Sequence, residues 1–186
     1  MVAVSGASGV VYASRLIEIL PKVYDVVYLT LSDNAEKILR HELGVQDPLE
    51  IIPAQHSHKF CIFEQSDLFV PPASGSHEYE GLVVVPCSMG FVGRIASGVS
   101  NDLVTRVADV CLKERRKLVL VVRETPLNLV HLRNLTALAE AGAVILPACP
   151  AFYNSPRTLN DAVDFVVDRV LHVLGTDERL VAGWGE

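Results

Sequence analysis

Residues 2–20 read Val2-Ala-Val-Ser-Gly-Ala-Ser-Gly-Val-Val-Tyr-Ala-Ser-Arg-Leu-Ile-Glu-Ile-Leu20, and the rest of the expected fold can be built outward from them. A short run of apolar, mostly β-branched residues enters a loop of small residues, Ser5 to Gly9, and an amphipathic helix follows. A strand that turns through glycines into a helix leaves bare N–H groups and the positive end of the helix dipole at one place. The sequence therefore predicts either an anion site for a phosphate or nucleotide, or a tight strand–helix turn. Because the pattern is neither Gly-x-Gly-x-x-Gly nor a Lys-bearing phosphate loop, NAD and ATP are not the favoured ligands.

The alternation of strand and helix continues along the chain. The expected elements are a strand over Asp25–Leu31, a helix over Ala35–Leu43, and later strands over Gly81–Pro86, Leu118–Val122 and Ala143–Leu146, each followed by a helical segment. Such alternation predicts an α/β fold with a mostly parallel sheet and helices on both faces. Residues 44–80 interrupt it with prolines and a Ser-Gly-Ser run, and we expect a long excursion with only short pieces of structure.

The composition excludes several classes of function. A chain of 186 residues suits one domain with a sizeable core. Its 16 basic and 22 acidic residues give a net charge of −6, so nucleic acid is not an expected partner. No apolar run approaches the roughly 18 residues of a membrane span, and no signal peptide is visible.

The cysteines and histidines do not form a metal-binding pattern. The four cysteines stand far apart, which favours reduced thiols in a cytoplasmic protein; they are Cys61, Cys87, Cys111 and Cys149. His56, His58 and Cys61 form a loose group, but no second ligand pair is spaced to close a metal site. We therefore expect a polar loop there and no metal.

Small or charged residues follow several of the expected strands. They are Ser5–Gly9, Ser32, Cys87–Gly90, and Arg123 with Glu124. A doubly wound sheet binds its ligand at the carboxyl ends of its strands, so these features are expected at one site. Three backbone turns and an arginine suit a phosphorylated flat cofactor better than a metal. A serine nucleophile is not indicated, because neither Ser8 nor Ser88 lies in a Gly-x-Ser-x-Gly elbow.

Four motifs carry a family resemblance that spans residues 2–175. They are Ser-Gly-Ala-Ser-Gly at 5–9, Val-Pro-Cys-Ser-Met at 85–89, the run from Asn101 to Pro126, and Gly-Ala-Val-Ile-Leu-Pro-Ala-Cys-Pro-Ala-Phe-Tyr at 142–153. Together they resemble the UbiX-type flavin prenyltransferases and, more weakly, the wider fold of the homo-oligomeric flavin-containing Cys decarboxylases. The resemblance implies a Rossmann-like three-layer subunit in a large homo-oligomer, typically a dodecamer, that binds FMN at subunit contacts and requires no metal.

The resemblance also implies an activity and a set of site residues. Family members transfer a dimethylallyl group from dimethylallyl phosphate to N5 and C6 of reduced FMN, and the prenylated FMN serves a UbiD-type decarboxylase. By motif, FMN would be held by Gly6, Ala7, Ser8, Ser32, Ser88, Met89, Gly90, Phe91 and Arg123. The prenyl phosphate would be bound by Arg106, Lys113, Tyr153 and Arg169. Catalytic roles fall to Ser8, Glu42 and Glu124, the first two in proton handling and positioning near N5.

Some residues depart from the family's pattern, namely Asp33, Gly90-Phe91, Leu68 and Asn154, and these bear on substrate fit and turnover more than on FMN binding. Two rival functions remain, an FMN-dependent cysteine-type decarboxylase of the same fold and a non-catalytic flavin-binding subunit. The downstream pathway and the choice between dimethylallyl monophosphate and diphosphate also stay open. We expect a single flavoprotein domain over residues 1–175 and a C-terminal arm over 176–186 that reaches a neighbouring subunit.

Overall fold

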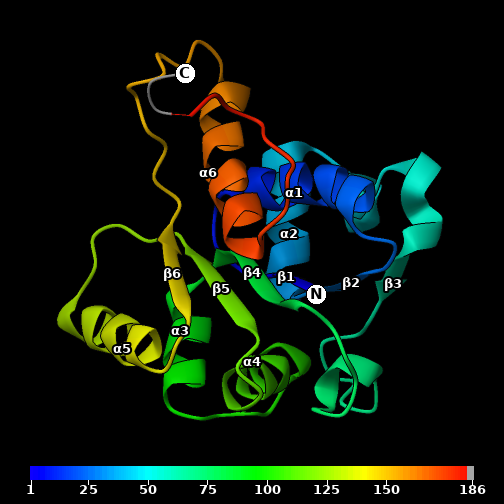
Figure 1. The fold of residues 1–186 in the computed structure, drawn as a ribbon, viewed down its shortest axis with the longest axis vertical. Coiled ribbons are helices and arrows are strands. Elements are labelled where there is room, and N and C mark those ends of the chain that lie inside the picture. The colour runs from blue at the N-terminus through cyan, green and yellow to red at the C-terminus, as the bar shows by residue number, and fades with distance from the viewer. Residues whose placement is uncertain (184–186) are drawn as a thin grey trace.

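A six-stranded sheet forms the centre of the computed structural model, which describes residues 1–183 of the chain (Figure 1). The strands lie in the order β3-β2-β1-β4-β5-β6, and every pairing is parallel. Their bounds are β1 Val2–Val4, β2 Val27–Leu31, β3 Phe60–Ile62, β4 Gly81–Cys87, β5 Lys117–Val122 and β6 Val144–Pro147. The predicted α/β fold is confirmed, and the sheet of the described residues is parallel throughout.

Helices cover both faces of the sheet and complete a three-layer arrangement (Figure 1). They are α1 Val10–Val23, α2 Asp33–Leu43, α3 Met89–Ala96, α4 Leu103–Lys113, α5 Leu129–Glu140 and α6 Leu159–Leu174. The helices α1, α2 and α6 share one core cluster with the sheet, and α3, α4 and part of α5 share the other. The layers place α4 and α6 on opposite faces.

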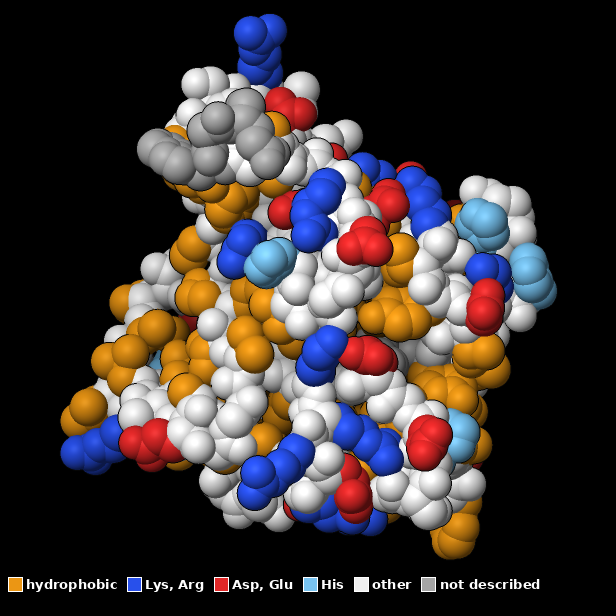
Figure 2. Space-filling view, viewed as in Figure 1, with side chains coloured by type: hydrophobic (Ala, Val, Ile, Leu, Met, Phe, Trp, Pro, Cys, Tyr) orange, Lys and Arg blue, Asp and Glu red, His pale blue; other side chains and the backbone are white. Residues whose placement is uncertain are grey.

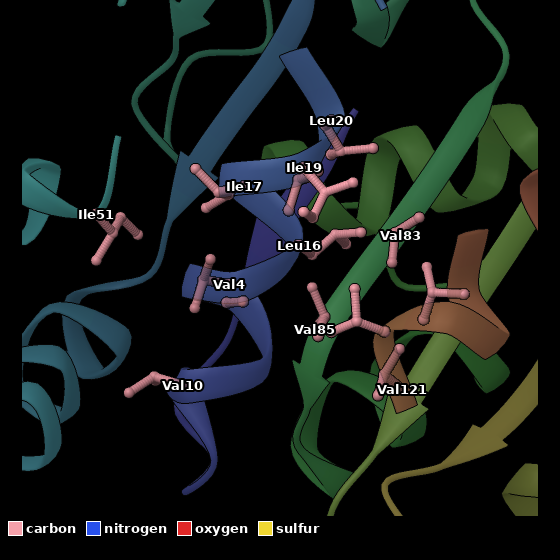
Figure 3. Packing of buried hydrophobic residues seen from close by; sticks show 14 of the residues in the cluster. Val4, Val10, Leu16, Ile17, Ile19, Leu20, Ile51, Val83, Val85 and Val121 are labelled. Atoms are coloured by element: carbon pink, nitrogen blue, oxygen red, sulfur yellow. The ribbon is translucent and has the colours of Figure 1, made fainter. Parts of the chain in front are cut away.

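Alternate residues of the central strands divide between the two cores. Val83 and Val85 of β4 belong to the cluster of α1 and α6, which Figure 3 shows from close by, and Leu82 and Val84 belong to the cluster of α3 and α4. Burial on both faces is typical of parallel strands, and it explains why β4 and β5 read as continuous apolar runs rather than as alternating ones.

Residues 44–80 form the expected excursion with short pieces of structure. These are three 3₁₀ turns, Pro48–Ile51, Ala54–Lys59 and Pro71–Ala73, and the strand β3 at the edge of the sheet. The strand was not predicted, because three residues carry too short a pattern to recognise. Within residues 1–183, no group of three His, Cys, Asp or Glu side chains could hold a metal ion, and no helix is long and apolar enough to cross a bilayer.

The described part of the expected C-terminal arm, residues 176–183, folds back on α6. The Leu180 amide donates to the buried carboxylate of Asp168 at 2.8 Å, and Glu178 lies 3.7 Å from the Lys22 ammonium group. Residues 184–186, with Trp184, lie outside the described residues. The domain boundary at residue 175 and the reach of the arm to a neighbouring subunit remain predictions.

Candidate active site

The strand order changes direction between β1 and β4, and the crevice at this switch point collects the turns that follow both strands. Ser5 joins these turns. Its hydroxyl donates to the Pro86 carbonyl at 2.7 Å and accepts from the Ser88 amide at 2.8 Å, and the residue is fully buried. Ser5 therefore fixes the first turn against the start of α3. No separate role for Ser5 was predicted, although its position at the start of a glycine-rich turn was a signal in the sequence.

The start of α1 is capped by a carboxylate from α2. Glu42 Oε2 accepts hydrogen bonds from the Gly9 amide at 2.9 Å and the Val10 amide at 3.2 Å. Partial burial alone would raise the pKa of Glu42, but the Ser8 hydroxyl, these two amides and the nearby Arg123 charge together hold that pKa below its ordinary value. Two of the N–H groups that were expected to be available to a ligand therefore donate to the protein's own Glu42 carboxylate.

Arg123 links the first turn to the end of β5. Its Nε donates to the Ser8 carbonyl at 3.1 Å, and its backbone N–H donates to the Cys87 carbonyl at 3.2 Å. The structure therefore brings Ser8, Glu42 and Arg123 together. Glu124 is the next residue, is exposed, and accepts a hydrogen bond from the Thr125 amide at 3.0 Å.

A pocket of about 330 Å³ opens next to this cluster, between the starts of α2 and α3. Its lining comes from four parts of the chain, as Gly6, Ser32, Asp33, Asn34, Gln65, Ser88, Gly90, Phe91 and Arg94. A Cβ atom at Gly6 would lie 2.6 Å from Cβ of Asn34, so only glycine lets the first turn approach α2 this closely. Ala7 and Met89 are buried beside the pocket.

The pocket presents hydrogen-bond donors at both helix starts. Ser32 Oγ caps α2 by accepting from the Ala35 amide at 3.1 Å, whereas the Ser88 hydroxyl does not cap α3. Among the described residues, the amides of Asn34, Met89 and Gly90 have no hydrogen-bond partner. Two helix N-termini that point amides at one cavity favour a negatively charged group there.

The four residues expected to bind the prenyl phosphate lie in two separate pairs. The first pair, Arg106 and Lys113, lies on α4. Arg106 Nε donates to the Ala73 carbonyl at 3.0 Å, and Lys113 forms an ion pair with Glu114 close to Gly75. Tyr153 and Arg169 line a pocket of about 710 Å³ between α6 and residues 179–183. Because α4 and α6 cover opposite faces of the sheet, one chain does not bring the two pairs into one cluster.

Comparison with known proteins places this fold and site in a class. A family model described as Flavoprotein matches residues 1–171, so the chain is a flavoprotein of the α/β type. The flavin prenyltransferase UbiX of Methanocaldococcus jannaschii is 46% identical over 185 residues, which cover 100% of this chain and 97% of that relative. UbiX of Pseudomonas aeruginosa is 41% identical, with coverage of 99% and 92%. The chain belongs to the UbiX flavin prenyltransferase family.

Solved structures agree with this assignment. A dodecameric FMN-dependent UbiX-like decarboxylase from Escherichia coli O157:H7 has a TM-score of 0.87 at 34% identity and covers 100% of both chains. AnUbiX (PadA1), solved in complex with FMN and dimethylallyl pyrophosphate, has a TM-score of 0.87 at 36% identity, with coverage of 98% and 96%. The peptidyl-cysteine decarboxylase EpiD is 15% identical, with a TM-score of 0.63 and coverage of 94% of this chain and 96% of EpiD. This similarity shows only that the two proteins have the same fold.

Proposed function

We propose that the protein transfers a dimethylallyl group from a dimethylallyl phosphate to N5 and C6 of reduced FMN, and that the prenylated FMN serves a UbiD-type decarboxylase. The observation that carries this proposal is the crevice in which Gly6, Ser32 and Ser88 line one pocket beside the cluster of Ser8, Glu42 and Arg123. The names of the full-length relatives, and the FMN and dimethylallyl pyrophosphate bound to AnUbiX, support the same chemistry.

The hydrogen-bond donors in the pocket suit the phosphate ester of FMN. The amides of Asn34, Met89 and Gly90 and the Ser88 hydroxyl are available to oxygen atoms of a phosphate ester. Phe91 adds an aromatic side chain to the lining. When bound and reduced, FMN supplies the two nucleophilic atoms that form bonds to the prenyl group.

Ser8 and Glu42 are suited to handle a proton near the flavin. Replacement of the C6 hydrogen of a bound flavin by the prenyl group would break the C6–H bond and release one proton, which a carboxylate such as Glu42 could accept. Because the hydrogen bonds to Glu42 lower its pKa, the side chain is ionised at neutral pH and can act as that acceptor. The Ser8 hydroxyl that bonds to it can pass the proton or position the carboxylate.

The separate pairs of phosphate-binding residues are best explained by a second copy of the chain. Breaking the allylic C–O bond develops negative charge on the leaving phosphate, and fixed Arg and Lys donors stabilise that charge. Arg106 and Lys113 on α4 can act together with Tyr153 and Arg169, which line the pocket along α6, if α4 of one subunit meets that pocket of another. The dodecameric UbiX-like relative supports an assembly of this kind.

Exposed apolar side chains also support an assembly. They cluster on and around α5 and along the loop after β6, as Leu127, Leu129, Val130, Leu132, Phe152 and Leu159. Figure 2 shows hydrophobic side chains gathered over the region of α5 and β6. A patch of this kind is typical of an interface between subunits.

The four cysteines are free thiols, which supports the expected cytoplasmic placement.

A coupled assay tests the transfer and the downstream partner together. The protein is incubated anaerobically with reduced FMN and either dimethylallyl monophosphate or diphosphate, and the filtrate is added to a UbiD-type apo-decarboxylase. We expect decarboxylase activity with at least one of the two phosphates and none when either FMN or the prenyl donor is omitted. Absence of activation, although FMN binds to the protein, would favour the cysteine-type decarboxylase or the flavin-binding subunit.

A further inference from the structure

Arg94 is a cation in the wall of the flavin pocket, and no role had been expected for it. It lies on α3, one turn after Phe91, and lines the same pocket as Gly6, Ser32 and Ser88. Its guanidinium carbon is 4.1 Å from the centroid of the Phe91 ring, and its Nη1 forms an ion pair with Asp102. Its side chain is 34% exposed, so part of the guanidinium can reach a ligand.

The guanidinium is held in place from two sides. Asp102 is itself fixed, because it caps α4 by accepting from the Thr105 amide at 2.8 Å and also accepts from Gln65 Nε2 at 2.9 Å. The Phe91 ring supports the flat face of Arg94 through a cation–π contact. A cation that is fixed before the ligand arrives loses little side-chain entropy on binding, which strengthens its contribution to affinity.

Donors on Arg94 remain available to a ligand. Its hydrogen bonds to Asn101 and Asp102 both use Nη1, and Nε and Nη2 have no partner among the described residues. Asp33 at the start of α2 also lines the pocket, and its negative charge would repel an anion there. An anionic ligand in this pocket therefore needs a cation as well as the helix amides, and Arg94 is the cationic side chain in the lining.

We propose that Arg94 binds the phosphate group of FMN and makes the site select FMN over riboflavin. This inference rests on the proposed function, because it assigns the phosphate end of that cofactor to the pocket between α2 and α3. The isoalloxazine ring would then lie toward Ser8, Glu42 and Arg123, where the first turn meets the end of β5. Arg94 is a cofactor-binding residue in this proposal and takes no part in the proton transfer.

The test compares the dissociation constants of FMN and riboflavin for the wild type and three variants, by quenching of flavin fluorescence. Arg94→Ala should weaken FMN binding by about 10- to 100-fold, the usual range for loss of a charged hydrogen bond, and leave riboflavin binding unchanged. Arg94→Lys, which keeps the charge but not the flat stacked group, should fall between the wild type and Arg94→Ala. Arg40→Ala, on the surface of α2 and paired with Glu36 at 3.5 Å, is the matched control and should change neither constant.

The other outcomes overturn the proposal in distinguishable ways. Equal weakening of FMN and riboflavin would show that Arg94 only supports the shape of the pocket. Unchanged binding of both would show that it serves only to neutralise Asp102. If Arg94→Ala does not fold, Arg94→Lys provides the test through the ratio of its dissociation constants for FMN and riboflavin. A ratio equal to that of the wild type would contradict a contact between the guanidinium group and the phosphate. A wild-type protein that binds neither flavin would contradict the proposed function itself.

Discussion

The carboxylate of Glu42, near the end of α2, accepts a hydrogen bond of 2.9 Å from the amide of Gly9 at the start of α1. This contact joins two helices that are separated by a full strand, and it places a proton acceptor at the turn where a flavin would approach. It also means that the positive end of α1 is partly neutralised by the protein. A phosphate is then better accommodated at the starts of α2 and α3, where amides remain available.

Substitution of Glu42 should separate its capping role from its chemical role. Glu42→Ala leaves the Gly9 and Val10 amides without their acceptor and should lower the free energy of unfolding by about 1 kcal/mol, as for loss of a helix cap. Glu42→Gln keeps an oxygen acceptor and should lose less stability, but it cannot accept a proton, so prenyl transfer should slow by about 10²- to 10⁴-fold. Chemical denaturation and single-turnover rates measure the two effects. A Glu42→Gln variant with wild-type turnover would exclude this residue as the proton acceptor.

Gly6 should not tolerate a side chain. The Cβ of Gly6→Ala would lie 2.6 Å from Cβ of Asn34, so the first turn and α2 must move apart at a cost of about 1–3 kcal/mol. FMN affinity should fall as well, because both sides of the pocket shift. Gly93→Ala on α3 is the matched control: its Cβ would be 3.5 Å from the nearest atom, an ordinary contact, and alanine favours a helix. Thermal unfolding with and without FMN compares them, and equal behaviour of the two variants would contradict the close approach at Gly6.

Asp102 should make stability depend on acid pH. Burial alone would raise its pKa, but the Thr105 amide and hydroxyl and the Arg94 charge lower it overall. The folded pKa is then below the unfolded value of about 3.9, so the unfolded chain takes up the proton first as the pH falls. The free energy of unfolding should therefore decrease below about pH 4. Asp102→Asn should have a lower free energy of unfolding than the wild type at neutral pH, but should lose less of it as the pH falls below about 4. Urea unfolding at several pH values measures this, with Asp25→Asn at an exposed carboxylate as the reference. An unchanged acid limb in Asp102→Asn would contradict the assignment.

Arg169 should matter for substrate rather than for folding. Its side chain is exposed on α6, so Arg169→Ala should change the free energy of unfolding by less than about 0.5 kcal/mol. If Arg169 binds the prenyl phosphate, the same variant should raise KM for that substrate and leave the dissociation constant of FMN unchanged. Lys37→Ala, which removes an exposed cation from α2, is the matched control for charge. Wild-type kinetics in Arg169→Ala would remove this residue from the proposed phosphate site.

The parallel sheet was predictable because its central strands β1, β4 and β5 are short, buried on both faces and followed by a helix, as Leu82 to Val85 illustrate. The edge strand at Phe60 was not, because its three residues are partly or fully exposed and no α-helix follows them directly. The meeting of the glycine-rich turn with the turn at Ser88 was predictable, because both turns follow neighbouring parallel strands, and the structure shows that both line one pocket. The role of Arg94 was not, because it depends on a pairing with Asp102 and a stacking on Phe91 that only the folded chain brings together.

The mass of the flavin extracted after reaction shows whether this protein adds a prenyl group to FMN. The protein is reduced anaerobically with FMN and dimethylallyl phosphate, the flavin is released by denaturation, and its mass is recorded. A flavin heavier by one C5 unit is expected with at least one of the monophosphate and the diphosphate. Bound FMN that returns unmodified with both donors would contradict the proposed transferase activity.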